Sequence, residues 1–489
     1  MIASPHRLAS EAGAQVLRDG GNAVDAAIAA DAVLCVVYPH MTSIGGDLMA
    51  IVWPAGASAP VGLIAAGRSG EHATIEAARS RGHETMPERG VLTVTVPGTV
   101  EAWGRLLERF GSLGLAPLLE PAAELARDGY VITPSLSEAL KNAAGLLARE
   151  QAAQELYPPM EGGMLLRNPD LATVLSELGR HGINGFYRGE VGAAIAAAIG
   201  KRDGFVTGRD LATHRSQWVD TVTAGYRDLM VHELPPPTQG LTALAMLARL
   251  DLMAPERLEP GPDFVAAFKS VRDECYPLRD RYITDPDFAM APVDKFVSPQ
   301  TVPDGGDTVY LCAADEHGNL VSLIQSVAFD FGSGIVAEGT GILLQNRGSY
   351  FSLDPRHVNR LEPKKRTMHT LIPALATRAG RPWALFGTMG GDGQPQLQTQ
   401  VLINLVDHGL DPQEAVARPR FRVVADGSRT TLEATYPGAA ALARQGPQFE
   451  LLPPRHHTLG HAHAIVIDGP TQWRAGSDPR SDGAVVTAH

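Results

Sequence analysis

The amino-acid sequence predicts an α+β fold in which helices and strands are segregated along the chain. From about Val96 to Asp280 the pattern is mainly helical and amphipathic, as in the stretch PGTVEAWGRLLERFG. After Thr301 it changes to short apolar runs bounded by turn residues, which is typical of strands. Helices followed by strands and then by mixed elements favour a layered α+β fold over a doubly wound sheet.

The N-terminal stretch predicts two consecutive helices. Gly20 and Gly21 separate them, and a glycine readily takes the left-handed conformation that ends a helix. Asn22 is placed to cap the second helix, and Asp25 follows three residues later, where its carboxylate reaches back to the cap. The alanine-rich residues that follow are apolar on nearly all sides, so we expect this helix to be buried.

Short apolar runs bounded by glycine and proline predict core strands at Leu48–Trp53 and Gly62–Gly67. Residues 308–315 and 320–327 read as two strands joined by a tight turn with the sequence His-Gly-Asn. Residues 463–468, HAIVID, read as a further strand near the C-terminus.

Composition limits the classes of partner. The chain has 489 residues with 42 basic and 54 acidic side chains, a net charge of −12, and no long basic run, which argues against a nucleic-acid or anionic-membrane partner. No apolar stretch approaches the roughly 18 to 20 residues of a membrane span, and the N-terminus lacks a signal-type apolar core, so we expect a cytoplasmic protein. Cys35, Cys275 and Cys312 are few and lie among apolar neighbours, which indicates buried thiols rather than disulfides.

A histidine-rich stretch, RHHTLGHAHA, contains His456, His457, His461 and His463. Their spacing fits no standard zinc set, and no cysteine or carboxylate ligand is close by in the sequence. We therefore expect no metal and no other cofactor.

A threonine is the candidate nucleophile. The G-x-S-x-G, Walker and H-E-x-x-H signatures are absent, whereas Thr308 stands at the start of a predicted strand after Gly305-Gly306-Asp307. A threonine hydroxyl needs a base to attack, and a threonine that becomes an N-terminus carries one in its own α-amine. Taken alone, Gly-Asp-Thr is equally an ordinary junction between a turn and a strand.

Longer blocks of sequence favour the nucleophile over an ordinary junction between a turn and a strand. The run DTVYLCAADEHGNLVSLIQS resembles the start of the small subunit of γ-glutamyltranspeptidase-family proteins, which are N-terminal-nucleophile hydrolases. The blocks SPHRLASEAGAQVLRDGGNAVDAAIAA, YPHMTSIGGD, TVPGTVEAW, LFGTMGGDGQPQLQTQVLINLVDHGLDPQEAVARPRFR and GSDPRSDGA are similar to that family in the same order.

The resemblance implies a four-layer αββα sandwich in a single domain of residues 1–489. It implies that Thr308 cleaves the Asp307–Thr308 bond, leaving a large subunit of residues 1–307 and a small subunit of residues 308–489, and then forms an acyl-enzyme. The resemblance also implies that the hydroxyl of Ser326 hydrogen-bonds the nucleophile. It places the oxyanion donors at Gly390 and Gly391, and a substrate-carboxylate partner at Arg68.

At other positions the sequence departs from true transpeptidases. Ala328, Arg347 and Tyr350 stand where those proteins have polar and acidic residues that hold the substrate ammonium. Arg366 and Thr367 replace the Ser-Ser pair that contacts the substrate α-carboxylate. These departures resemble the divergent branch that includes oxamate amidohydrolase and cephalosporin-acylase-like proteins.

The expected function is hydrolysis of an amide of a small carboxylate-bearing acyl group, with water or an amine as acceptor. Three alternatives stay open: a true γ-glutamyl transferase or glutathione hydrolase, a hydrolase of a C–C bond that removes an oxalyl-type group, and an unprocessed binding protein. The expected assembly is a heterodimer of processed chains, with further dimerisation left open.

Overall fold

Two antiparallel sheets packed face to face form the centre of the protein. The structure is a computed structural model that describes residues 1–292, 307–469 and 472–488. The first sheet has the strand order β20 (Ala484–Val486), β1 (Ile2–Ser4), β9 (Asp307–Ala314), β10 (Leu320–Ala328), β2 (Asp47–Trp53), β3 (Val61–Ala65) and β6 (Gln217–Val219). The second has the order β19 (Gln472–Ser477), β18 (Ala462–Gly469), β14 (Arg381–Thr388), β13 (Ala374–Arg378), β8 (Leu229–Glu233) and β7 (Val222–Tyr226).

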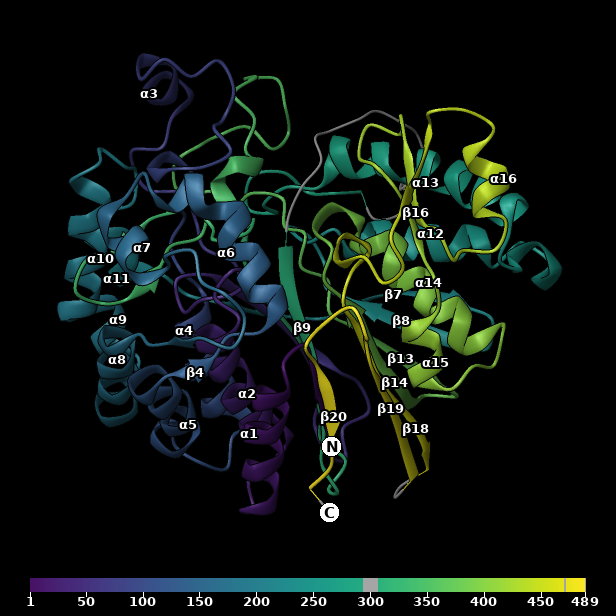
Figure 1. Cartoon of the computed structure of the whole chain (residues 1–489), viewed down its shortest axis with the longest axis horizontal. Helices are drawn as coiled ribbons and strands as arrows, with labels where there is room; N and C mark the ends of the chain where they lie inside the picture. Colours follow the sequence, from purple (N-terminus) through teal and green to yellow (C-terminus); the bar gives the residue numbers. More distant parts are fainter. Residues whose placement is uncertain (293–306, 470–471, 489) are drawn as a thin grey trace.

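Helices cover the outer face of each sheet, which completes the predicted αββα sandwich (Figure 1). On the first sheet lie α1 (Arg7–Arg18), α2 (Ala23–Val37) and α4 (Thr99–Phe110), and the same hydrophobic core extends outward to α5 (Leu115–Asp128), α6 (Pro134–Leu147), α8 (Pro169–His181) and α10 (Glu190–Gly200). On the second sheet lie α12 (Gly240–Leu250), α14 (Gln394–Val406) and α15 (Pro412–Ala417), and its core extends outward to α13 (Pro262–Tyr282) and α16 (Ala439–Ala443).

Shorter elements lie around this frame. They are α3 (Ile75–Ser80), α7 (Gln151–Leu156), α9 (Asn184–Arg188), α11 (Gly208–Thr213), β4 (Tyr130–Val131), β5 (Leu165–Leu166), β11 (Val336–Ala337), β12 (Ile342–Leu343), β15 (Phe421–Val423), β16 (Thr430–Glu433) and β17 (Phe449–Leu452).

Strand β9 is buried on both faces. Val309 and Leu311 face the helical layer, whereas Tyr310 and Cys312 face the second sheet. This alternation follows from the two-residue period of a strand, and burial on both faces explains why the segment is almost continuously apolar. By the same period, the side chain of Thr308 points between the two sheets.

The predicted helix pair at the N-terminus is confirmed. Gly20 has a φ of 89°, and Asn22 caps α2 by accepting from the backbone N–H groups of Val24 and Asp25. The Asp25 carboxylate accepts from the Asn22 N–H at 3.0 Å, so the capping box is complete. All residues of α2 are buried, as its apolar composition requires.

The sequence pattern missed β6, β7 and β8, which lie within the stretch predicted to be mainly helical. These strands are short, and the residues of β6 and most of those of β7 are not fully buried. A short strand near a sheet edge needs no strong apolar pattern, because tertiary pairing stabilises it. The three cysteines are buried free thiols, as predicted.

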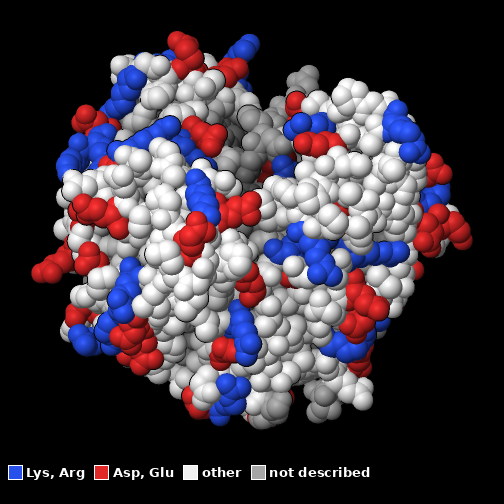
Figure 2. Space-filling model, in the orientation of Figure 1, with Lys and Arg blue, Asp and Glu red and all other residues white. Residues whose placement is uncertain are grey.

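Acidic and basic side chains are interspersed over the face of the molecule shown in Figure 2. None of the described helices is both long and apolar enough to cross a membrane. The described residues also contain no group of three or more His, Cys, Asp or Glu side chains that could hold a metal ion.

Candidate active site

Thr308 is the second residue of β9 and is only 1% exposed. Its Oγ1 accepts a hydrogen bond of 3.4 Å from Nε2 of Gln394, at the start of α14. The Oε1 atom of the same Gln394 accepts from the backbone N–H of Ile372 at 3.3 Å. The hydroxyl therefore lies between the sheets, with one partner from the second half of the sandwich.

The pairing of β9 with β10 is interrupted beside Thr308. Val309 pairs with Gln325 and Asp307 pairs with Ala328, so Ser326 and the residue after it form a bulge opposite Thr308. Ala328 has a φ of 84°, an unfavourable conformation for a residue with a Cβ. The bulge is held by a hydrogen bond of 2.7 Å from the Ala328 N–H to Ser326 Oγ. Bulges of this kind are over-represented next to active sites.

The loop after β14 supplies candidate oxyanion donors. Gly390 has a φ of 132° and Gly391 a φ of 49°, so both adopt left-handed conformations that favour glycine. Their backbone N–H groups donate to no acceptor among the described residues. Strand β14 approaches β9 closely, because a Cβ added at Gly387 would lie 2.5 Å from the ring of Tyr310. This contact brings the glycine loop to the end of β9 that carries Thr308.

A buried polar scaffold fixes that loop from behind. Gln239 Nε2 donates to the carbonyl oxygen of Gly391 at 2.9 Å and to that of Thr370 at 3.0 Å. Its Oε1 accepts from Arg279 Nη1 at 3.2 Å, and Arg279 forms an ion pair with Asp392 in the same loop. The loop is thus held by Gln239, which directly precedes α12, and by Arg279 of α13.

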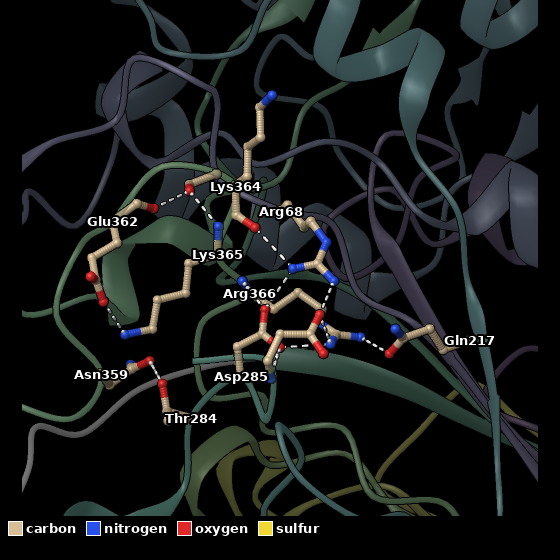
Figure 3. A network of polar contacts seen from close by, with 11 residues as sticks. Arg68, Gln217, Thr284, Asp285, Asn359, Glu362, Lys364, Lys365 and Arg366 are labelled. Atoms are coloured by element: carbon tan, nitrogen blue, oxygen red, sulfur yellow. Dashed lines mark hydrogen bonds and ion pairs between the residues drawn. The ribbon is translucent and has the colours of Figure 1, made fainter. Parts of the chain in front are cut away.

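Arg68 and Arg366 lie together in a charged cluster with two aspartates (Figure 3). Arg68 contacts Asp285 at 2.8 Å and Asp287 at 2.6 Å. Arg366 contacts the same carboxylates at 2.6 and 3.3 Å, and it also donates to Gln217. Burial alone would raise the pKa of Asp285, but its bonds with Arg366 and the Arg68 charge lower that pKa below its ordinary value. The two guanidinium groups are therefore balanced by two carboxylates.

Arg347 is fully buried in a short 3₁₀ turn. Its Nη1 donates to Thr370 Oγ1 at 2.9 Å, and its guanidinium lies 5.3 Å from the ring centre of Tyr350. The Tyr350 ring stacks on Phe329, with ring centres 5.7 Å apart. Thr367 Oγ1 accepts from Asn359 Nδ2 at 2.8 Å.

A buried carboxylate and imidazole lie beside these residues. Asp47 accepts from the Gly67 N–H at 2.9 Å and from Gln345 Nε2 at 3.0 Å, and its other oxygen is 3.1 Å from His369 Nε2. Burial and then the charge of Arg347 lower the pKa of His369 to about 4. The imidazole is therefore neutral near pH 7, and its Nε2–H donates to Asp47.

The sequence model described as Gamma-glutamyltranspeptidase matches residues 9–488. The chain belongs to the γ-glutamyltranspeptidase family. It is 35% identical to the glutathione hydrolase-like YwrD proenzyme of Bacillus subtilis (strain 168), covering 99% of this chain and 98% of the relative. It is 34% identical to the oxamate amidohydrolase proenzyme of Klebsiella pneumoniae, with the same coverage of both chains.

The crystal structure of cephalosporin acylase from Bacillus halodurans is similar over nearly the whole fold. The TM-score is 0.91 at 35% identity, and the match covers 99% of this chain and 95% of that one. The γ-glutamyltranspeptidase-family chain is thus an enzyme with the N-terminal-nucleophile hydrolase sandwich that its sequence predicts.

The structure brings Thr308, Ser326, Gly390 and Gly391 to one end of the sandwich, where the β10 bulge lies opposite Thr308 and Gln394 of the helix after the glycine loop donates to its hydroxyl. Gly305 and Gly306 lie outside the described residues, as does the side chain of Asp307. Five residues of the site were not predicted from the sequence: Gln239, Arg279, Asp285, Asp287 and Gln394. Only Gln394 had a local signal, because it follows the glycine loop directly in MGGDGQPQ.

Proposed function

We propose that this protein is a self-processing threonine hydrolase that cleaves the amide of a small carboxylate-bearing acyl group. The observation that carries the proposal is the position of Thr308, a buried hydroxyl beside a strand bulge and near a glycine loop with two unused N–H donors. A nucleophile with preorganised donors for the developing oxyanion is what acyl transfer requires.

In the processing step, Thr308 Oγ attacks the carbonyl carbon of Asp307 and its proton passes to the departing backbone nitrogen. The acyl group moves from nitrogen to oxygen, and water then hydrolyses the ester. The products are a chain ending at Asp307 and a chain beginning with the free amine of Thr308. Both similar proteins named above are called proenzymes, which supports a processed product.

In turnover, the α-amine of Thr308 takes the hydroxyl proton as Oγ attacks the substrate carbonyl. An N-terminal amine has a pKa of about 7.7 to 8.0, so a useful neutral fraction exists near pH 7.5. The N–H groups of Gly390 and Gly391 hold the oxyanion, and the leaving amine takes the proton. Water, or an amine acceptor, then releases the acyl group from Thr308.

The test of processing is denaturing electrophoresis with mass determination. Wild-type protein should give two pieces, the smaller beginning at Thr308. Thr308→Ala should give one intact, inactive chain, because no hydroxyl remains for either step, whereas Thr308→Ser should retain some cleavage and activity. Efficient cleavage of the Thr308→Ala variant would contradict the proposed processing mechanism.

The substrate class is tested by comparing acyl amides on processed enzyme. The relative named oxamate amidohydrolase supports a desamino acyl group, whereas the one named glutathione hydrolase-like makes a γ-glutamyl amide the second candidate. We expect kcat/KM for glutaryl, succinyl or oxamate-type amides to exceed that for the γ-glutamyl amide by more than about tenfold, or roughly 1.4 kcal/mol. A preference for the γ-glutamyl amide would favour the second candidate.

A further inference from the structure

Three arginines lie close to the proposed substrate site, and they differ in whether their charge is already balanced. Arg68 and Arg366 share Asp285 and Asp287, at distances of 2.6 to 3.3 Å. A guanidinium that already holds a carboxylate gains little from a second one, because the second carboxylate must overcome repulsion from the first. This pair is thus poorly suited to bind a further anion.

Arg347 has no such counter-ion. Its side chain is 0% exposed, and no carboxylate of the described residues lies within ion-pair distance of it. Asp47 is near enough to influence its charge, but the oxygens of Asp47 are already occupied by Gly67, Gln345 and His369. Burying an unpaired guanidinium is costly, so this site is incomplete without an anion.

The unused donors of Arg347 form one edge. Nη1 is occupied by Thr370, whereas Nε and Nη2 are buried and have no partner among the described residues. Nε and Nη2 share one edge of the planar guanidinium, and one N–H bond of each points in parallel within that plane. That geometry matches the two oxygens of a single carboxylate, which is the bidentate arrangement that arginine favours.

Arg347 is linked to the bulge and to the glycine loop through its neighbour Asn346 and its partner Thr370. The backbone N–H of its neighbour Asn346 donates to the carbonyl of Val327, directly after Ser326, at 3.0 Å. Its partner Thr370 shares Gln239 with Gly391 of the glycine loop. Arg347 is therefore held in the same framework as the bulge and the candidate oxyanion donors.

We propose that Arg347 is the specificity-determining residue that receives the carboxylate of the acyl group, and that Arg68 and Arg366 form an internally neutralised cluster that supports the site. This inference rests on the proposed function and defines its substrate class. The acyl group carries one terminal carboxylate that binds the Nε–Nη2 edge, and it has no ammonium, which the Arg347 charge would repel.

The test compares two amides that differ only at the acyl terminus, glutaryl p-nitroanilide and valeryl p-nitroanilide. Wild-type enzyme should prefer the glutaryl amide by more than tenfold in kcat/KM. Arg347→Met should reduce this preference to less than threefold by lowering activity on the glutaryl amide alone. Arg347→Lys should give an intermediate preference, because lysine keeps the charge but lacks the parallel donor edge.

Two further variants serve as comparison. Arg109→Met removes an exposed arginine that stacks on Trp218, and it should keep the wild-type preference. Arg68→Met leaves Asp285 and Asp287 with less compensation and should lower activity on both amides alike. Loss of the preference in Arg68→Met with its retention in Arg347→Met would overturn the assignment.

The wild-type measurement keeps the inference testable even if a variant does not fold. Processed, active enzyme with equal kcat/KM for the two amides would contradict the role of Arg347 and leave the proposed nucleophile intact. An unprocessed chain, or one inactive on both amides, would contradict the proposed function and this inference with it.

Discussion

At the scale of single residues, Gln239 supports the glycine loop from behind through hydrogen bonds. It is fully buried, and its amide bonds the carbonyls of Gly391 and Thr370. Gln239→Leu removes these bonds at similar volume, so the glycine loop loses its support. We expect kcat to fall about 10- to 100-fold with KM nearly unchanged, less than the loss of an oxyanion donor itself. The exposed Gln154→Leu is the control, and a change confined to KM would argue against a positioning role.

At the scale of elements, the predictable parts are those whose signal is local. The glycines and capping residues of α2 and the apolar runs of β2, β9 and β10 lie within a few residues of the structure they specify. The partners of the site are not local. Gln239 and Thr308 support the same site from positions far apart in the sequence, and Asp285 meets Arg68 only because two sheets pack together. The spacing of apolar residues along the sequence does not predict contacts between residues so far apart in the chain.

The β10 bulge gives a prediction at the same scale. Ala328 has a φ of 84°, where a Cβ is unfavourable by about 1 kcal/mol. Ala328→Gly should therefore leave the free energy of unfolding unchanged or raise it by up to about 1 kcal/mol. Ala314→Gly at the end of β9 is the matched control and should lower it by about 1 kcal/mol, since a glycine in an ordinary strand loses more entropy on folding. Urea denaturation of the two variants measures both effects, and destabilisation by Ala328→Gly would show that the Cβ makes a necessary contact.

At the scale of the whole molecule, the two predicted subunits are interleaved within one sheet. Strands β9 and β10 lie between β1 and β2, which precede Thr308 in the chain, and β20 pairs with β1 at the edge. Cleavage before Thr308 would therefore separate Asp307, the first residue of β9, from the rest of the strand but leave the pairing of β9 from Val309 onward in place. We expect the two pieces to elute together in size-exclusion chromatography without denaturant, whereas separate elution would contradict this arrangement.

Buried histidines make the stability of the whole molecule depend on pH. Burial is the largest cause that lowers the pKa of five of them to about 3 or 4, and these are His40, His214, His369, His461 and His463. Unfolded histidines bind a proton near pH 6.5, so below that pH the unfolded chain takes up more protons than the folded one. Their contribution to stability is complete above pH 6.5 and is lost as the pH falls toward 4.

Buried carboxyls oppose this effect but are fewer. Burial raises the pKa of Asp31 to about 7 and that of Asp280 to about 6, and it also raises the pKa of Glu233, so these groups favour the folded state as the pH falls. The five imidazoles outnumber them, and each contributes up to about 1.4 kcal/mol per pH unit. We therefore expect the urea midpoint to fall between pH 7 and pH 5. Both ring nitrogens of His461 lack a partner among the described residues, so His461→Phe should reduce the slope by about one proton. A midpoint that rises on acidification would mean that the carboxyls, not the imidazoles, dominate the titration of the folded core.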